Sequence, residues 1–168
     1  MTIAPPPATA TEPHDVAALV RAATADDHRA AESRGFITAL MGGELSLDEY
    51  TRYLGQLAWV YDALEERGSR PGDPAVFDPA LARMAAIDAD LASLGAADWR
   101  EAHPPLPATA DYATHLRVIA DDGVVRYKRG YREAMNALAL QPAEVDVLIA
   151  EVRTSFRMNS AIFEALAD

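Results

Sequence analysis

The stretch from Ser46 to Arg67, SLDEYTRYLGQLAWVYDALEER, contains a complete helix pattern. Ser46 and Glu49 have the spacing of a capping box, in which each side chain bonds to the other residue's backbone N–H. Apolar side chains then recur at helical spacing and are expected to face inward: Leu47, Tyr50, Leu54, Leu57, Ala58, Tyr61 and Leu64. Gly68 is a suitable stop signal. The stretch therefore predicts a helix from about Leu47 to Arg67.

Similar patterns cover most of the chain. A first helix is expected from the N-cap Asp15 to near Gly35, with one side formed by Val16, Leu19, Val20, Ala23, Asp27, Ala30 and Ala31. A short apolar turn is expected over FITALMGG. Further helical segments are expected over residues 79–95, DWREA, residues 108–121, VVRYKRGYREAMNAL, and from Pro142 to Leu166. No alternating strand pattern or repeat occurs, so the sequence predicts an all-α, compact multi-helix bundle. The expected organisation is a disordered, proline-containing tail over residues 1–13 and a single helical domain over residues 14–168.

Composition excludes several classes of function. The 168 residues include 26 acidic and 15 basic side chains, a net charge of −11, which argues against nucleic acid as a partner. There is no cysteine, which excludes disulfides and thiolate metal sites and fits a reducing compartment, so the expected location is the cytoplasm. Neither a long apolar stretch nor a secretory signal pattern is present, and no membrane association is expected.

His28 is the first candidate ligand, in the stretch TADDHRAAE from Thr24 to Glu32. On a continuous helix, Arg21, His28 and Glu32 would lie within about 40° of each other, beside the apolar face. Neutral imidazole is a common iron ligand, and a carboxylate one turn away can accept a hydrogen bond from the other ring nitrogen. The alternative is an ordinary surface histidine with a carboxylate at i+4.

Two later segments supply further candidates. RYKRGYRE, residues 126–133, places Lys128 and Arg132 four residues apart, where they could hold the carboxylates of an anionic ligand. A solvated basic face is the alternative, and stacking on single-stranded nucleic acid is disfavoured by the net charge. In SFRMNSAIFEAL, Phe156 and Asn159 lie three apart and could touch one ligand, although core packing is the default. No catalytic serine motif, phosphate loop or HExxH motif occurs.

Taken together, these stretches resemble the biliverdin-forming heme oxygenases. TADDHRAAE is similar to the family's proximal helix pattern T-x-x-x-H-x-x-A-E, and LAWVYDALEER is similar to its second helix. YKRGYREAMNALAL resembles the K-x-x-Y-R-x-x-M/L-N-x-L segment, and TSFRMNSAIFEAL resembles the A-F-x-x-N-x-x-x-F-x-x-L ending. The resemblance runs from about Asp15 to Leu166, and four matches in the right order make it fairly specific.

The resemblance implies a role for each matching residue. His28 would be the proximal iron ligand, with Glu32 beside it on the same helix. Arg21, Lys128 and Arg132 would lie near the heme propionates, and Phe156 would contact the heme. Tyr61 and Asn159 would belong to the hydrogen-bond network on the distal side. Heme suits such a set of residues, since it is an apolar disc with two carboxylates and needs an apolar slot, one axial base and cations at the mouth.

The chain departs from the family on the distal side. The family's G-D-L-S-G-G motif is absent, and THLRVIADDG leads directly into VVRYKRGYRE, so a stretch worth about two helices is missing together with its tyrosine and arginine. Three accounts are open: the segment belongs to the natural protein but not to this chain; the protein is a shortened variant with poor turnover; or another part of the chain or a second subunit covers the distal face. The first is favoured because the flanking matches are so well kept.

The implied activity is heme oxygenase: ring opening of heme to biliverdin, CO and Fe²⁺, with oxygen and with electrons from a separate reductase or ferredoxin. Heme would be both substrate and cofactor, and the protein is expected to be a monomer. A heme carrier or sensor with the same proximal site and no turnover is the alternative from the binding class. A helical relative acting on a non-heme metal or a thiamine-type substrate is the third hypothesis. The absence of paired ExxH motifs and of a cysteine nucleophile argues against it.

Overall fold

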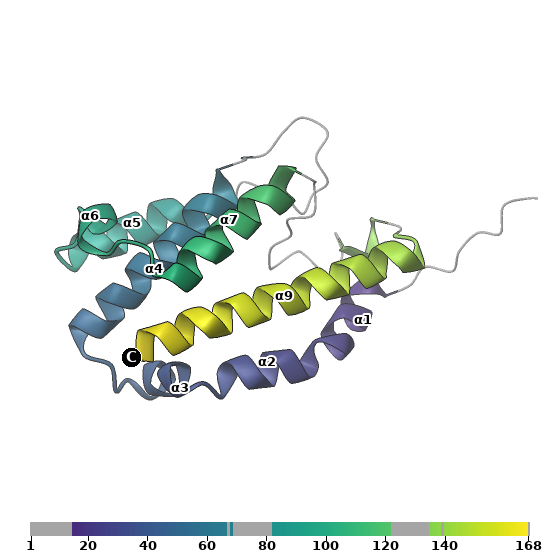
Figure 1. Ribbon diagram of the computed structural model, residues 1–168, viewed down its shortest axis with the longest axis horizontal. Helices are drawn as coiled ribbons and strands as arrows, with labels where there is room; N and C mark the ends of the chain where they lie inside the picture. Colours follow the sequence, from purple (N-terminus) through teal and green to yellow (C-terminus); the bar gives the residue numbers. More distant parts are fainter. Residues whose placement is uncertain (1–14, 67, 69–81, 122–134, 139, 168) are drawn as a thin grey trace, which may run out of the picture.

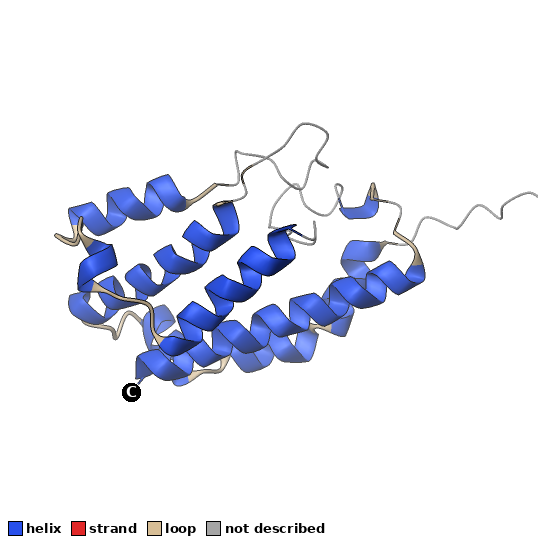
Figure 2. Ribbon diagram, turned by 45° about the horizontal axis from the view of Figure 1, so that its top comes forward, coloured by secondary structure: helices blue, strands red, loops and turns tan. Residues whose placement is uncertain are grey.

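The computed structural model describes residues 15–66, 68, 82–121, 135–138 and 140–167, and every regular element among them is a helix (Figures 1 and 2). In chain order the helices are α1 (Val16–Ala23), α2 (Ala25–Glu32), α3 (Gly35–Gly42), α4 (Leu47–Glu65), α5 (Met84–Ser93), α6 (Trp99–Ala102), α7 (Pro107–Asp121) and α9 (Pro142–Ala167). The predicted all-α class is confirmed. The expected tail and single domain stay predictions, because residues 1–14 lie outside the described part.

The 26-residue helix α9 joins the two sides of the bundle, and it is roughly 39 Å long at 1.5 Å per residue. Helices α1, α2 and α3 lie along one side of it, and α7 packs against another side and also against α4 (Figure 1). Helices α5 and α6 extend the layer formed by α4. The helix that bears His28 is therefore held mainly by α9.

Three buried clusters hold these layers together. One joins α3, α4, α7 and the end of α9, and contains Phe36, Val60, Ala63, Tyr112, Ala113, Leu116, Ile162 and Leu166. The second joins α4 to α5 and α6, and contains Leu54, Ala58, Ile87, Leu91, Ala96 and Trp99. The third joins α1 to the start of α9 and to Met135, and contains Val16, Val20, Met135, Val145 and Leu148. Because α9 contributes to the first and third clusters, it connects α1 to the rest of the core.

Helix α4 begins as the sequence predicts. The Ser46 hydroxyl accepts a hydrogen bond from the Glu49 N–H at 3.3 Å, and the Glu49 carboxylate accepts one from the Ser46 N–H at 2.7 Å. The inward face is shorter than expected, however: Leu47 is 64% exposed and Tyr50 is 36% exposed, so both expectations of burial are wrong. No described element covers the first turn of α4, and burial begins at Thr51.

The expected continuous helix from Asp15 to Gly35 is also wrong, because the structure interrupts it at Thr24. The last helical bond of α1 runs from the Thr24 N–H to the Val20 carbonyl at 3.0 Å, and the Thr24 hydroxyl donates to the same carbonyl at 2.8 Å. The backbone leaves the helical conformation at Thr24, with φ −112° and ψ 10°. Helix α2 then begins at Ala25. The helical wheel that grouped Arg21 with His28 assumed one straight helix and does not apply across this break.

Candidate functional site

His28 lies on α2 between a carboxylate and an aromatic ring. Its Nδ1 is 3.2 Å from Oε2 of Glu32, one turn further along the same helix. The Phe156 ring, on α9, meets the imidazole edge-on, with 5.5 Å between ring centroids and 71° between ring planes. The His28 side chain is 47% exposed, so part of it remains open to solvent.

This arrangement suits an imidazole that binds a ligand through one nitrogen. When a carboxylate accepts the Nδ1 proton, the lone pair of the neutral ring is at Nε2. The described residues contain no group of three or more His, Cys, Asp or Glu that could enclose a metal ion by themselves. The chemistry of the donor set therefore fits a metal that brings most of its own ligands, as heme iron does, and His28 would supply the axial one.

Beside the imidazole, α2 and α9 enclose an open hollow of about 260 Å³. Its lining is mixed, with Asp27, Ala30, Arg34, Phe156, Arg157, Ser160, Ala161 and Glu164. Arg34, the N-cap of α3, forms an ion pair with Glu164 across it, which ties the start of α3 to the end of α9. Most of these charges thus serve contacts of α9 with α2 and α3.

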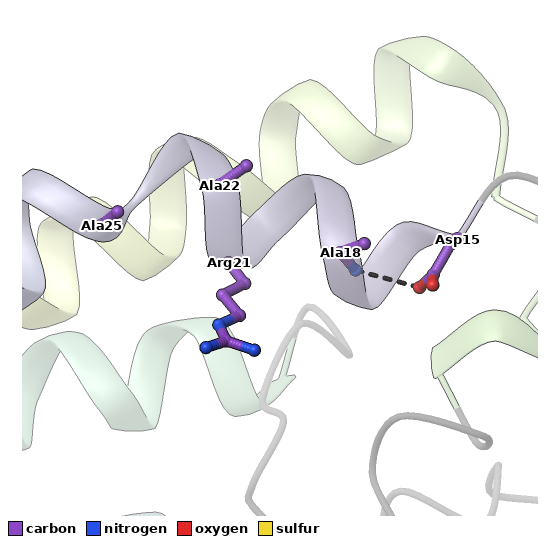
Figure 3. Close-up of a pocket in the computed structure, with 5 residues that line it drawn as sticks. All are labelled: Asp15, Ala18, Arg21, Ala22 and Ala25. Atoms are coloured by element: carbon purple, nitrogen blue, oxygen red, sulfur yellow. Dashed lines mark hydrogen bonds between the residues drawn. The ribbon is translucent and has the colours of Figure 1, made fainter.

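Arg21 occupies a different surface. It is exposed on α1 and lines a hollow of about 290 Å³ with Asp15, Ala18, Ala22 and Ala25 (Figure 3). Figure 3 shows its guanidinium extending away from α1, while the Asp15 carboxylate caps the helix by accepting from the Ala18 N–H at 2.9 Å. No bond between Arg21 and His28 is present in this part of the chain, and the role of Arg21 stays a prediction.

The remaining predicted site residues are not all brought together. Phe156 contacts His28, as described above, and Asn159 is partly buried one turn further along α9. Tyr61 packs on α4 against the α4–α5–α6 cluster, so it belongs to another part of the bundle from α2. Lys128 and Arg132 lie outside the described residues.

The sequence analysis missed one residue that contacts the helix of His28 directly. Arg153, on α9, donates from Nη2 to the Ala23 carbonyl at 2.7 Å, and its Nε lies 3.5 Å from the Asp27 carboxylate. Its position three residues before Phe156 was the available signal. The sequence alone did not indicate a partner for Arg153, because the Ala23 carbonyl accepts this bond only where the helix breaks at Thr24.

Comparison with known proteins identifies the family. The Heme oxygenase family profile matches residues 14–125, two thirds of the chain. The chain belongs to the heme oxygenase family. Heme oxygenases are oxidoreductases for which heme is both substrate and cofactor, so the predicted family, enzyme class and cofactor are confirmed.

Individual heme oxygenases agree with this result. Heme oxygenase 1 of Gallus gallus is 26% identical over an alignment 206 residues long, which covers 90% of this chain and 70% of that protein. The structure of heme oxygenase-1 from the cyanobacterium Synechocystis in complex with heme matches with a TM-score of 0.76 and 22% identity, covering 91% of this chain and 92% of that one. The Synechocystis heme oxygenase-2 structure, in complex with heme and NO, matches with a TM-score of 0.81 and 18% identity, covering 91% and 85%. At these identities the structural matches support the fold.

The alignment also bears on the distal side. The aligned region with the Gallus gallus protein, 206 residues, is longer than the whole chain of 168, so that relative has residues inside it that this chain lacks. The family profile match ends at residue 125, next to the place where the G-D-L-S-G-G motif is missing from the sequence. The missing stretch is therefore internal to the aligned region.

Among the residues that the structure describes, no helix has both the length and the apolar character needed to cross a bilayer.

Proposed function

We propose that this chain binds heme through His28 and opens its ring to biliverdin, CO and Fe²⁺, using oxygen and electrons from a separate reductase or ferredoxin. The observation that carries the proposal is the imidazole itself, which is half-exposed, faces Glu32 with Nδ1 and is held edge-on by Phe156. Family membership supplies the reaction class. The expected form is a monomer in the cytoplasm.

Each residue would contribute binding or orientation. Glu32 would accept a hydrogen bond from the Nδ1–H of His28, which fixes the tautomer of the ring and leaves Nε2 to bind iron. Phe156 would limit rotation of the ring and cover part of the porphyrin. Arg21, Lys128 and Arg132 would attract the propionate carboxylates. When bound, the heme iron supplies the oxygen chemistry, and the protein supplies the axial base and the orientation.

Tyr61 and Asn159 are proposed for the distal hydrogen-bond network. Tyr61 packs against the α4–α5–α6 cluster, in a different part of the bundle from the cluster that holds α1 to α9. Asn159 lies on the same helix as Phe156, three residues on, and is the stronger of the two candidates.

A heme carrier or sensor is the second candidate function. The observation that favours it is the absence of the G-D-L-S-G-G stretch, which in the enzymes resembled here orders water on the distal side. Binding through His28 would be the same in both cases, and only turnover would differ.

Two measurements test the proposal. Hemin titrated into the protein should produce a Soret band that saturates at one equivalent, and the band should weaken and shift in His28→Ala. His103→Ala is the matched control, because Trp59 bonds to the His103 backbone carbonyl and not to its ring. A saturable band that is identical in His28→Ala would contradict the assignment of the ligand.

Ascorbate added in air then separates enzyme from carrier. Replacement of the Soret band by a biliverdin spectrum, with release of CO, supports heme oxygenase activity. A stable Soret band under these conditions supports the carrier. Absence of any Soret band with the wild-type protein would exclude both.

A further inference from the structure

The break between α1 and α2 leaves a backbone acceptor one turn before His28. In a continuous helix the Asp27 N–H would bond to the Ala23 carbonyl. Here α1 ends at Ala23, and α2 starts its own pattern with the His28 N–H bonded to the Thr24 carbonyl at 3.0 Å. The Ala23 carbonyl is one of the groups that a helix end must satisfy in another way.

Arg153 supplies the missing donor from a helix 130 residues away in sequence. Its Nη2 donates to the Ala23 carbonyl at 2.7 Å, and its Nε lies 3.5 Å from Oδ2 of Asp27. One guanidinium thus holds the last residue of α1 and the first turn of α2 together. A planar guanidinium can do this because its donors point in fixed, diverging directions.

The next turn of α9 reaches the imidazole. Phe156 lies three residues after Arg153 and meets the His28 ring edge-on. Helix α9 therefore contacts two consecutive residues of α2: the Arg153 guanidinium pairs with the Asp27 carboxylate, and the Phe156 ring packs against the His28 ring. Each helical residue is displaced by about 100° around the axis, so two such contacts fix the rotation of α2 as well as its distance from α9.

We propose that Arg153 is a positioning residue for the proximal ligand: by holding the α1–α2 break, it sets the direction in which the His28 imidazole points. The inference rests on the proposed role of His28. It assigns Arg153 no contact with heme. Its effect passes through Ala23 and Asp27 to the rotation of α2.

The first test uses the hemin complex. Arg153→Met keeps the length of the side chain but removes its donors and charge, and we expect about tenfold weaker hemin binding, since a charge-assisted hydrogen bond is lost. The iron–histidine stretching band of the ferrous complex should shift and broaden, because His28 would then sample several orientations. Arg153→Lys, which can still donate to the Ala23 carbonyl, should restore most of the affinity.

Arg117→Met is the matched control for these variants. Arg117 also ties two elements together, because its Nε on α7 donates to the Glu66 carboxylate at the end of α4 at 2.5 Å, but it has no part in the site on α2. Hemin affinity and the iron–histidine band should be unchanged in it. Asp27→Asn, which weakens the contact without removing Arg153, should shift the band in the same direction by a smaller amount.

The second test uses the heme-free protein. Amide hydrogen exchange at His28, whose N–H bonds to the Thr24 carbonyl at 3.0 Å, should be at least severalfold faster in Arg153→Met than in the wild type or in Arg117→Met. Wild-type affinity together with an unshifted band in Arg153→Met would overturn the positioning role, whatever the exchange rates.

Failure of the proposed function would look different. If the wild-type complex has no iron–histidine band and His28→Ala binds hemin equally well, the ligand assignment falls, and the positioning role falls with it. Faster exchange in Arg153→Met would then show only that Arg153 stabilises the α1–α2 break.

Discussion

The carboxylate beside Nδ1 of His28 determines how the imidazole can act as a ligand. Nδ1 lies 3.2 Å from the Glu32 carboxylate, and part of the side chain remains exposed. A carboxylate that accepts a hydrogen bond from Nδ1–H makes the imidazole a stronger electron donor at Nε2. Glu32 should therefore influence the bond to iron without touching the iron.

Replacing Glu32 by glutamine tests this influence. An amide oxygen can still accept a hydrogen bond from Nδ1–H but has no negative charge. We therefore expect hemin binding to weaken about tenfold, near the lower end of the effects seen when the hydrogen-bond partner of a metal-binding histidine is changed. The iron–histidine stretching frequency of the ferrous complex should fall. Asp26→Asn on the same helix is the control, since Asp26 pairs with Arg29 and not with the imidazole. Equal frequencies in Glu32→Gln and the wild type would contradict the role.

Gly55, in α4, lies where another segment approaches closely. A Cβ at this position would be 2.7 Å from the Cβ of His103. The His103 segment cannot easily move away: Trp59 donates to the His103 carbonyl at 2.9 Å, and Gln56 bonds to Pro104 and Leu106 at 3.1 and 2.9 Å. Glycine is thus required here by the His103 side chain, whose backbone is held in place.

We expect Gly55→Ala to destabilise the protein. Alanine gains about 1 kcal/mol in helix propensity, but overpacking costs about 1–3 kcal/mol, so the net loss should be about 1 kcal/mol. The midpoint of thermal unfolding should fall by roughly 2–4 °C for a chain of this size. Gly35→Ala is the control, because nothing lies within 4 Å of a Cβ there, and its midpoint should be unchanged or slightly higher. A higher thermal midpoint for Gly55→Ala would contradict the prediction and would show that the His103 segment moves to make room for the methyl group.

Among the helices, those with local start and stop signals could be predicted and the break in the first one could not. The capping box at Ser46 and the proline at the start of α9 act within a single turn, so the sequence alone determines these starts. The apolar pattern around Thr24 continues without interruption. The bonds that accompany the break come partly from Arg153, which no local pattern reveals.

The capping box also predicts a dependence on pH. Hydrogen bonds from the Ser46 hydroxyl, and then from its backbone N–H, lower the pKa of Glu49 below its ordinary value of 4.5. A carboxylate with a lowered pKa in the folded state stabilises the fold at pH above 4.5. That contribution is lost as the pH falls through the lowered value.

Ser46→Ala should therefore be more costly while Glu49 is charged, because the hydroxyl then also donates to the carboxylate. An N-cap substitution of this kind costs about 1 kcal/mol, and we expect that loss at pH 7, measured by urea unfolding. The difference from the wild type should narrow at pH 3. Ser93→Ala is the control, since its hydroxyl donates to the Asp90 carbonyl and caps no helix start. A difference independent of pH would assign the whole effect to the serine hydroxyl.

At the scale of the whole molecule, the site is an exposed surface of α2 held from one side by α9. The sequence predicted His28 and Glu32 on one helix face, and the family resemblance implied only a heme contact for Phe156. The contact between the Phe156 ring and the imidazole comes from the structure. The sequence could not show that Tyr61 packs with the α4–α5–α6 cluster, because that depends on how distant helices pair. Lys128 and Arg132 stay predictions outside the described residues.

Binding of hemin to this surface should stabilise the entire fold, because α9 shares its contacts between α2 and two buried clusters. A ligand present at 100 times its dissociation constant adds about 2.7 kcal/mol to the free energy of unfolding. For a chain of this length the thermal midpoint should rise by roughly 5–10 °C. The prediction holds for the enzyme and for the carrier, since it requires binding alone.

His28→Ala should lose most of this rise, and His103→Ala should keep it. The comparison is made at equal free hemin, with the heme-free midpoints of both variants measured first, so that any cost of the substitution itself is subtracted. Hemin that merely stacks on exposed apolar side chains would raise the midpoint equally in all three proteins. Such a uniform rise in the midpoint would show that hemin binds to the surface without ligation by His28, and it would contradict the assignment of this imidazole to the iron.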